Sequence, residues 1–134
     1  MTRESNLSIK AKHNYKVANY SEHKKYYEVA ISRYYYYLYQ NIIDYINTNR
    51  IEIIEIENKG IHYKTINTFI RNISMNRDLN DEDLRYMGLL QELRTIRNYA
   101  DYRNELWNKT EYEKDFKNKF TTLNNIIAKK LQLW

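Results

Sequence analysis

The chain has no cysteine and no proline, and it has only two glycines, Gly60 and Gly88. The absence of cysteine excludes disulfide bonds, thiolate metal sites and a cysteine nucleophile. Tight turns are usually made with glycine and proline, so a β-rich fold of 134 residues would need more of both. Their scarcity therefore favours a few long helices joined by short loops.

Long apolar segments are also missing from the sequence. No apolar run approaches the roughly 18 residues that a membrane-spanning helix needs. The first twelve residues lack the apolar region of a secretory signal, so we expect a cytoplasmic protein. The three histidines, His13, His23 and His62, lie far apart, and the chain has no zinc-binding spacing and no glycine-rich phosphate loop. We therefore expect neither a metal nor a cofactor.

The length and composition are those of one globular domain. A chain of 134 residues can close one hydrophobic core but not two. Apolar residues make up 43% and charged residues 29%, which is not the composition of a disordered chain. We therefore predict a single domain over residues 1–134, with no membrane association.

Two features of the composition bear on partners. The formal net charge of +5 is a weak indication of a polyanionic partner, because scattered helical lysines usually form a solvated face. The 15 tyrosines indicate more, since a tyrosine offers a stacking face and a hydroxyl that can meet a base or a phosphate. Most of them are nevertheless expected in the core or at its rim.

The hydrophobic periodicity predicts five helices. They cover approximately residues 7–20, 21–46, 63–73, 80–103 and 110–134. The second helix is apolar around much of its circumference, which is typical of the central helix of a bundle. The expected core comprises Tyr34, Leu38, Ile42, Leu93, Ile96, Phe120, Leu123 and Ile127. The predicted fold class is an all-α, up-and-down helical bundle of about five helices.

The predicted helix boundaries rest on side-chain caps. Ser21, Asn80 and Thr110 are the expected N-caps of the second, fourth and fifth helices. Gly88 lies inside the expected fourth helix, where it is either tolerated or required by the close approach of another helix. Residues 47–58 alternate between isoleucine and glutamate, which fits a short strand, a helix extension or an ordered loop.

One segment late in the fourth helix concentrates chemical groups. Arg97 and Asp101 are four residues apart and share a helix face, with Arg94 one turn earlier. Asn98 and Tyr102 form a second pair on the adjacent strip. Such a patch can hold a phosphate through arginine. An ordinary intrahelical ion pair between Arg97 and Asp101 explains the same spacing, and the spacing alone favours it.

Three blocks of the sequence together resemble the HEPN family, in the order that the family shows. They are residues 30–39 (Ala-Ile-Ser-Arg-Tyr-Tyr-Tyr-Tyr-Leu-Tyr), residues 60–66 (Gly-Ile-His-Tyr-Lys-Thr-Ile) and residues 90–102. The third block ends Arg97-Asn98-Tyr99-Ala100-Asp101-Tyr102 and is similar to the Arg-x-x-Ala-Asp-Tyr ending of one HEPN branch. The resemblance covers approximately residues 15–130.

The resemblance implies a helical bundle that usually dimerises. Active members of the family are metal-independent ribonucleases of toxin–antitoxin, CRISPR and phage-defence systems. Their motif is an arginine, usually followed by a polar residue, with a histidine four to six residues after the arginine. Arg97 and Asn98 match the first two positions, but the histidine window holds Asp101, Tyr102 and Arg103 and no histidine. His62 could instead be brought to Arg97 by the fold, or be an exposed or capping residue.

The leading hypothesis is therefore an RNA-directed HEPN-type module of a bacterial defence or toxin–antitoxin system. If it cleaves RNA, Arg97 would stabilise charge on the phosphate, Asn98 and Tyr102 would orient it, and Asp101 would hold Arg97 or act as base. One alternative is an inactive HEPN module that binds a partner such as a nucleotidyltransferase or an antitoxin. The other is a helical interaction domain with a structural Arg–Asp pair. The resemblance further predicts a homodimer with Arg97 at a shared cleft.

Overall fold

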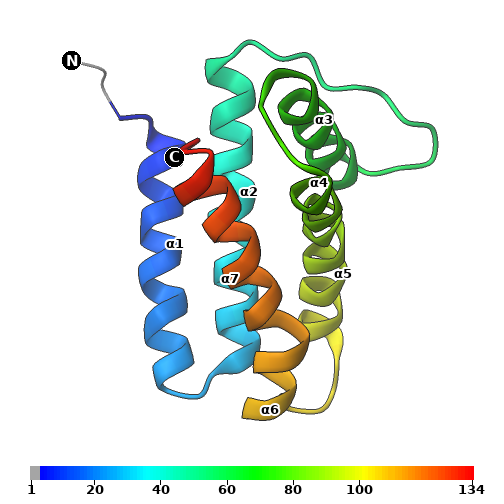
Figure 1. The fold of residues 1–134 in the computed structure, drawn as a ribbon. Helices are drawn as coiled ribbons and strands as arrows, with labels where there is room; N and C mark the ends of the chain where they lie inside the picture. The colour runs from blue at the N-terminus through cyan, green and yellow to red at the C-terminus, as the bar shows by residue number, and fades with distance from the viewer. Residues whose placement is uncertain (1–3) are drawn as a thin grey trace.

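The computed structural model describes residues 4–134, and these form an all-helical bundle (Figure 1). The elements are α1 (Asn6–His23), α2 (Tyr27–Thr48), α3 (Ile61–Asn76), α4 (Asp81–Met87), α5 (Leu89–Tyr102), α6 (Lys109–Tyr112), the π-helical turns η1 (Glu113–Lys117) and η2 (Asn125–Lys130), and α7 (Asn118–Asn124). The segments from α6 to η2 follow one another without a break. The predicted all-α bundle of five helices is confirmed.

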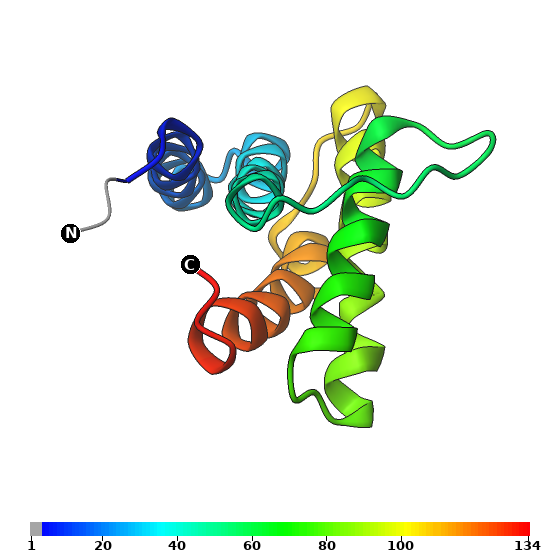
Figure 2. The same cartoon turned by 90° about the horizontal axis from the view of Figure 1, so that it is seen from above.

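Helix α2 lies at the centre of the bundle, with α1 on one side, α3 and α5 on the other, and α7 across a third face (Figure 2). Seven of the eight predicted core residues are buried, and Ile96 is half-buried because it borders a shallow surface pocket with Tyr99 and Trp107. Among the described helices, none is long and apolar enough to cross a membrane.

The prediction that Ser21 caps the second helix is wrong. Helix α1 continues through His23, and Ser21 is buried inside it. The helix ends where Lys25 adopts a left-handed φ of 66°, while the Tyr26 N–H donates to the Ser21 carbonyl at 2.8 Å. This is the termination usually made by glycine, and the backbone bonds that close it compensate for the lysine's unfavourable conformation.

Of the other two predicted caps, only Asn80 is used. Asn80 begins α4 with a capping box to Asp83, as predicted. The last helix is capped by Asn108, whose side chain accepts from the Glu111 N–H at 2.8 Å, and not by Thr110. Gly88 separates α4 from α5, and a Cβ there would meet only the Arg85 carbonyl oxygen, at 3.3 Å. The glycine therefore marks a local break, not the approach of another helix.

The ambiguous segment after α2 is a loop. Helix α2 extends to Thr48, and residues 51–60 then leave the bundle and return to α3 without forming a strand (Figures 1 and 2). The loop is anchored where the Ile54 N–H donates to the Thr68 hydroxyl at 2.9 Å. Ile51, Ile53 and Ile56 are half-buried, so the isoleucine–glutamate alternation separates an inward from an outward side.

Leu93 tests the packing of α5. Its side chain is fully buried, so Leu93→Ala should lower the free energy of unfolding by about 2–5 kcal/mol in urea titrations. The control is Met75→Ala, which changes a largely exposed apolar residue of α3 and should cost less than about 0.5 kcal/mol. Equal losses for the two variants would contradict the orientation of α5.

Candidate functional site

Arg97 lies on α5 and is largely buried. Its Nη1 atom is 3.3 Å from Oδ2 of Asp101, and its side chain is only 14% exposed. The guanidinium carbon lies 5.1 Å from the ring centre of Tyr35 and 5.4 Å from that of Tyr36. Contacts of this kind attract a cation to the ring face. The predicted ion pair is present, but its arginine is covered by aromatic side chains and is not a solvated surface group.

His62, in the first turn of α3, reaches the same place. Its Nδ1 atom is 2.8 Å from the Tyr35 hydroxyl, and its ring stacks on Tyr39 with 4.0 Å between the ring centres. Tyr35 therefore contacts both His62 and Arg97. The fold therefore brings His62 and Arg97 to the same tyrosine, in agreement with one of the alternatives given for His62 from the sequence.

The charges around His62 favour its neutral form. Burial lowers the pKa of His62 below 6.5, and the nearby charges of Arg97 and Arg94 lower it further. Burial also raises the pKa of the Tyr35 hydroxyl, and the two arginines only partly oppose this rise. The hydroxyl therefore keeps its proton and can take part in a hydrogen bond with the imidazole.

Arg94 adds a second cation, which α3 helps to position. Its Nε donates to the Gln91 side chain at 3.1 Å, and Gln91 donates to the Tyr63 carbonyl at 3.0 Å. The Arg94 guanidinium also lies 5.6 Å from the Tyr63 ring centre, and Lys59 Nζ lies 4.7 Å from the same centre. We call Tyr35, Tyr36, His62, Arg94 and Arg97 the Arg97–His62 cluster.

The cluster contains one polar atom without a partner. The Nε atom of Arg97 is buried and makes no hydrogen bond within residues 4–134. A buried N–H group without an acceptor is costly, and native structures rarely leave one. An acceptor oxygen brought by a ligand would satisfy it if the guanidinium shifted outward.

The other predicted site residues lie at the edge of this cluster. Asp101 borders a shallow pocket of about 260 Å³ between α2 and α5, together with Ser32 and Arg33. Asn98 is half-buried and forms no side-chain hydrogen bond with a described residue. Tyr102 is 86% exposed at the end of α5. Of the four predicted residues, the structure pairs only Arg97 and Asp101 directly.

Sequence reasoning missed the aromatic part of the cluster. Tyr35, Tyr36 and Tyr39 were identified as members of a tyrosine-rich central helix and of the first block that resembles the HEPN family, but not as site residues. The available signal was that the predicted second helix carries more tyrosines than one face needs, and that His62 directly precedes the predicted third helix. Only the docking of α3 on α2 shows which tyrosines meet the histidine.

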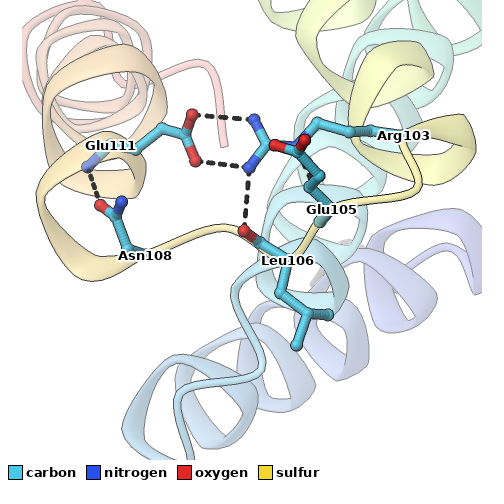
Figure 3. A network of polar contacts seen from close by, with 5 residues as sticks. All are labelled: Arg103, Glu105, Leu106, Asn108 and Glu111. Atoms are coloured by element: carbon cyan, nitrogen blue, oxygen red, sulfur yellow. Dashed lines mark hydrogen bonds and ion pairs between the residues drawn. The ribbon is translucent and has the colours of Figure 1, made fainter.

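The end of α5 is fixed by a separate network of polar contacts (Figure 3). Arg103 binds both carboxylate oxygens of Glu111, at 2.7 and 2.8 Å, and donates to the Glu105 and Leu106 carbonyls. The guanidinium holds the pKa of Glu111 below its usual range. A bidentate pair of this kind is geometrically specific. Arg103 therefore holds the loop after α5 against α6, which is a structural role.

Neither a metal site nor a known relative accounts for the cluster. Within the described part of the chain, no group of three or more histidine, aspartate and glutamate side chains could hold a metal ion. Comparison of the chain with protein-family models, with curated proteins and with solved structures found no match.

The titration of His62 tests the electrostatics of the cluster. Its imidazole should titrate below pH 6.5 in two-dimensional NMR spectra, and Arg97→Gln should raise the midpoint because it removes one of the cationic charges that lower this pKa. The control Arg33→Gln, which changes an exposed arginine on α2, should leave the midpoint unchanged. A midpoint above 6.5 would contradict the burial of the ring.

The lowered pKa of His62 determines the direction in which pH changes the stability of the folded protein. An unfolded histidine titrates near 6.5, so the unfolded chain binds this proton more tightly than the folded one. The contribution of His62 is therefore fully present above pH 6.5 and decreases as the pH falls below it. In urea titrations, the His62→Gln variant should lack this part of the decrease in the free energy of unfolding at low pH.

Proposed function

We propose that this protein is an HEPN-type, RNA-directed module that cleaves RNA without a metal ion, with the Arg97–His62 cluster as its site. The observation that carries the proposal is the contact of Tyr35 with both His62 and Arg97, which places a neutral histidine beside a buried arginine. The family's motif histidine follows its arginine on the same helix, and His62 would supply that group from α3.

The proposed chemistry is internal transfer at the phosphate. The ribose 2′-hydroxyl attacks the adjacent phosphorus, the bond to the 5′ oxygen breaks, and a 2′,3′-cyclic phosphate forms. In the tautomer with its proton on Nδ1, His62 donates to the Tyr35 oxygen and leaves Nε2 free to take the 2′ proton. The leaving 5′ oxygen takes its proton from the imidazolium or from water.

The two arginines supply the electrostatic part of the mechanism. Negative charge accumulates on the phosphate oxygens in the transition state, and fixed guanidinium groups stabilise it most effectively where water is excluded. In the free protein Asp101 neutralises Arg97 at 3.3 Å. A phosphate that displaces Asp101 would gain the guanidinium and could accept from its unpartnered Nε–H. Asn98 and the exposed Tyr102 remain the proposed orienting residues.

A second candidate function is that of an inactive module that binds a partner protein. It is favoured by the exposed apolar side chains at the end of α5, namely Tyr99, Tyr102 and Leu106. Contiguous exposed side chains of this kind are typical of interaction surfaces. The partner could be a nucleotidyltransferase or an antitoxin, as the family resemblance implies, or a second copy of this chain.

Cleavage of mixed RNA in EDTA separates these candidates. The wild-type protein should release products ending in cyclic phosphate. His62→Gln should lower the rate by about 10²–10⁴-fold, as expected for loss of a general base, and Arg97→Ala by about 10²–10³-fold. The control Arg71→Ala removes an exposed arginine on α3 and should retain activity. Wild-type protein without activity, or activity insensitive to both site variants, would leave the inactive module as the better explanation.

The oligomeric state provides an independent test. We propose a homodimer joined near the end of α5, so that the second subunit adds walls to an otherwise open site. Light scattering should then give about twice the chain mass of 16.6 kDa. The double variant Tyr102→Glu/Leu106→Glu should be monomeric, whereas Met75→Glu, at an equally exposed apolar residue of α3, should remain a dimer. A wild-type monomer at tens of micromolar would exclude the shared cleft.

A further inference from the structure

A pocket of about 600 Å³ lies on the side of α2 opposite to the Arg97–His62 cluster. It is bordered by α1, α2, Asn124 of α7 and the C-terminal Trp134, whose ring centre also lies 5.9 Å from that of Phe69 of α3. Three aromatic side chains, Tyr15, Tyr37 and Trp134, contribute to its walls. Its size is within the range of small-molecule sites, about 300–1,000 Å³.

Two amide side chains enter this pocket with unused hydrogen-bonding capacity. Asn41 is only 5% exposed, yet its amide has no hydrogen-bond partner among the described residues. Asn124 accepts from the Tyr37 hydroxyl at 2.7 Å, which leaves its NH₂ group free, and the Trp134 indole donates to the same hydroxyl at 3.2 Å. Both amides line the pocket, so it offers donors and an acceptor to a bound molecule.

The charges at the rim restrict what this molecule can be. Lys12 forms an ion pair with Glu4, whereas Lys16 has no carboxylate within 4 Å in residues 4–134. Lys16 therefore has no ion-pair partner among residues 4–134 and can face an anion in the pocket. A single negative charge would be balanced by Lys16, but a dianion would also experience repulsion from the Glu4 carboxylate.

We propose that this pocket binds a planar aromatic monoanion, specifically an aryl carboxylate. The ring would pack against Tyr15, Tyr37 and Trp134 in offset or edge-to-face contacts. The carboxylate would lie beside Lys16, and a polar substituent of the ring would bond to Asn41. This site is independent of the RNA function, because none of its lining residues belongs to the Arg97–His62 cluster.

The ligand class is tested with the whole chain by calorimetry and by ligand-observed NMR. The probes are 4-hydroxybenzoate and indole-3-carboxylate, their neutral amides, and adenosine monophosphate as a dianion. At least one carboxylate should bind with a Kd below about 1 mM and about tenfold more tightly than its amide. No binding of either carboxylate at about 5 mM, equal binding of acid and amide, or tighter binding of the nucleotide would each overturn the proposal.

Two variants locate the binding within the pocket. Lys16→Gln should reduce carboxylate affinity to that of the amide and leave the amide unchanged, because only the charge is removed. Asn41→Ala should weaken acid and amide alike by about tenfold. The control Lys10→Gln changes an exposed lysine of α1 outside the pocket and should have no effect. Because Lys16 is exposed, its variant remains a valid test even if Asn41→Ala fails to fold, and an unchanged affinity in Lys16→Gln would place the ligand elsewhere.

Discussion

Buried tyrosine hydroxyls of α2 need hydrogen-bond partners, and the arrangement of the bundle depends on which neighbouring helices supply them. Tyr34 bonds to Asn19 of α1, Tyr35 to His62 of α3, Tyr37 to Asn124 of α7 and Tyr45 to Asn72 of α3. A buried hydroxyl without a partner is costly, so these bonds fix α1, α3 and α7 in rotation as well as in position. Apolar packing alone would tolerate more than one such arrangement.

The two candidate sites follow from this division of α2 into faces. Tyr35 and Tyr36 point to α3 and α5 and cover Arg97, while Tyr37 points to α1 and α7 and borders the pocket with Asn41. Consecutive residues of a helix lie about 100° apart, so a run of tyrosines necessarily serves several surfaces. The run is thus a structural element that supports both sites, and its members have different environments.

The fold class could be predicted from the sequence because the fold class depends on local patterns of residues. The three- and four-residue spacing of Tyr34, Leu38 and Ile42 predicts the central helix, and Asn80 predicts the start of α4. The end of α1 could not be predicted in this way. It is made by Lys25 in a left-handed conformation, and the sequence alone favours glycine at such a position.

For the same reason, only part of the candidate site could be predicted from the sequence. The pairing of Arg97 with Asp101 follows from their four-residue spacing on one helix. The burial of Arg97 and its proximity to His62 depend on how α3 packs against α2 and α5, over 27 residues between Tyr35 and His62. No local pattern specifies that packing, so the histidine could be named as a candidate but not placed.

The bond between Tyr37 and Asn124 also constrains the order in which the molecule is completed. The two residues are 87 positions apart, so on the ribosome α2 is finished long before the partner of its hydroxyl has been made. The hairpin of α1 and α2 can form early, because its contacts are local. Its third face, however, stays hydrated until α7 arrives. The newly made chain therefore exposes an aromatic surface during synthesis, and α7 is the element that covers it.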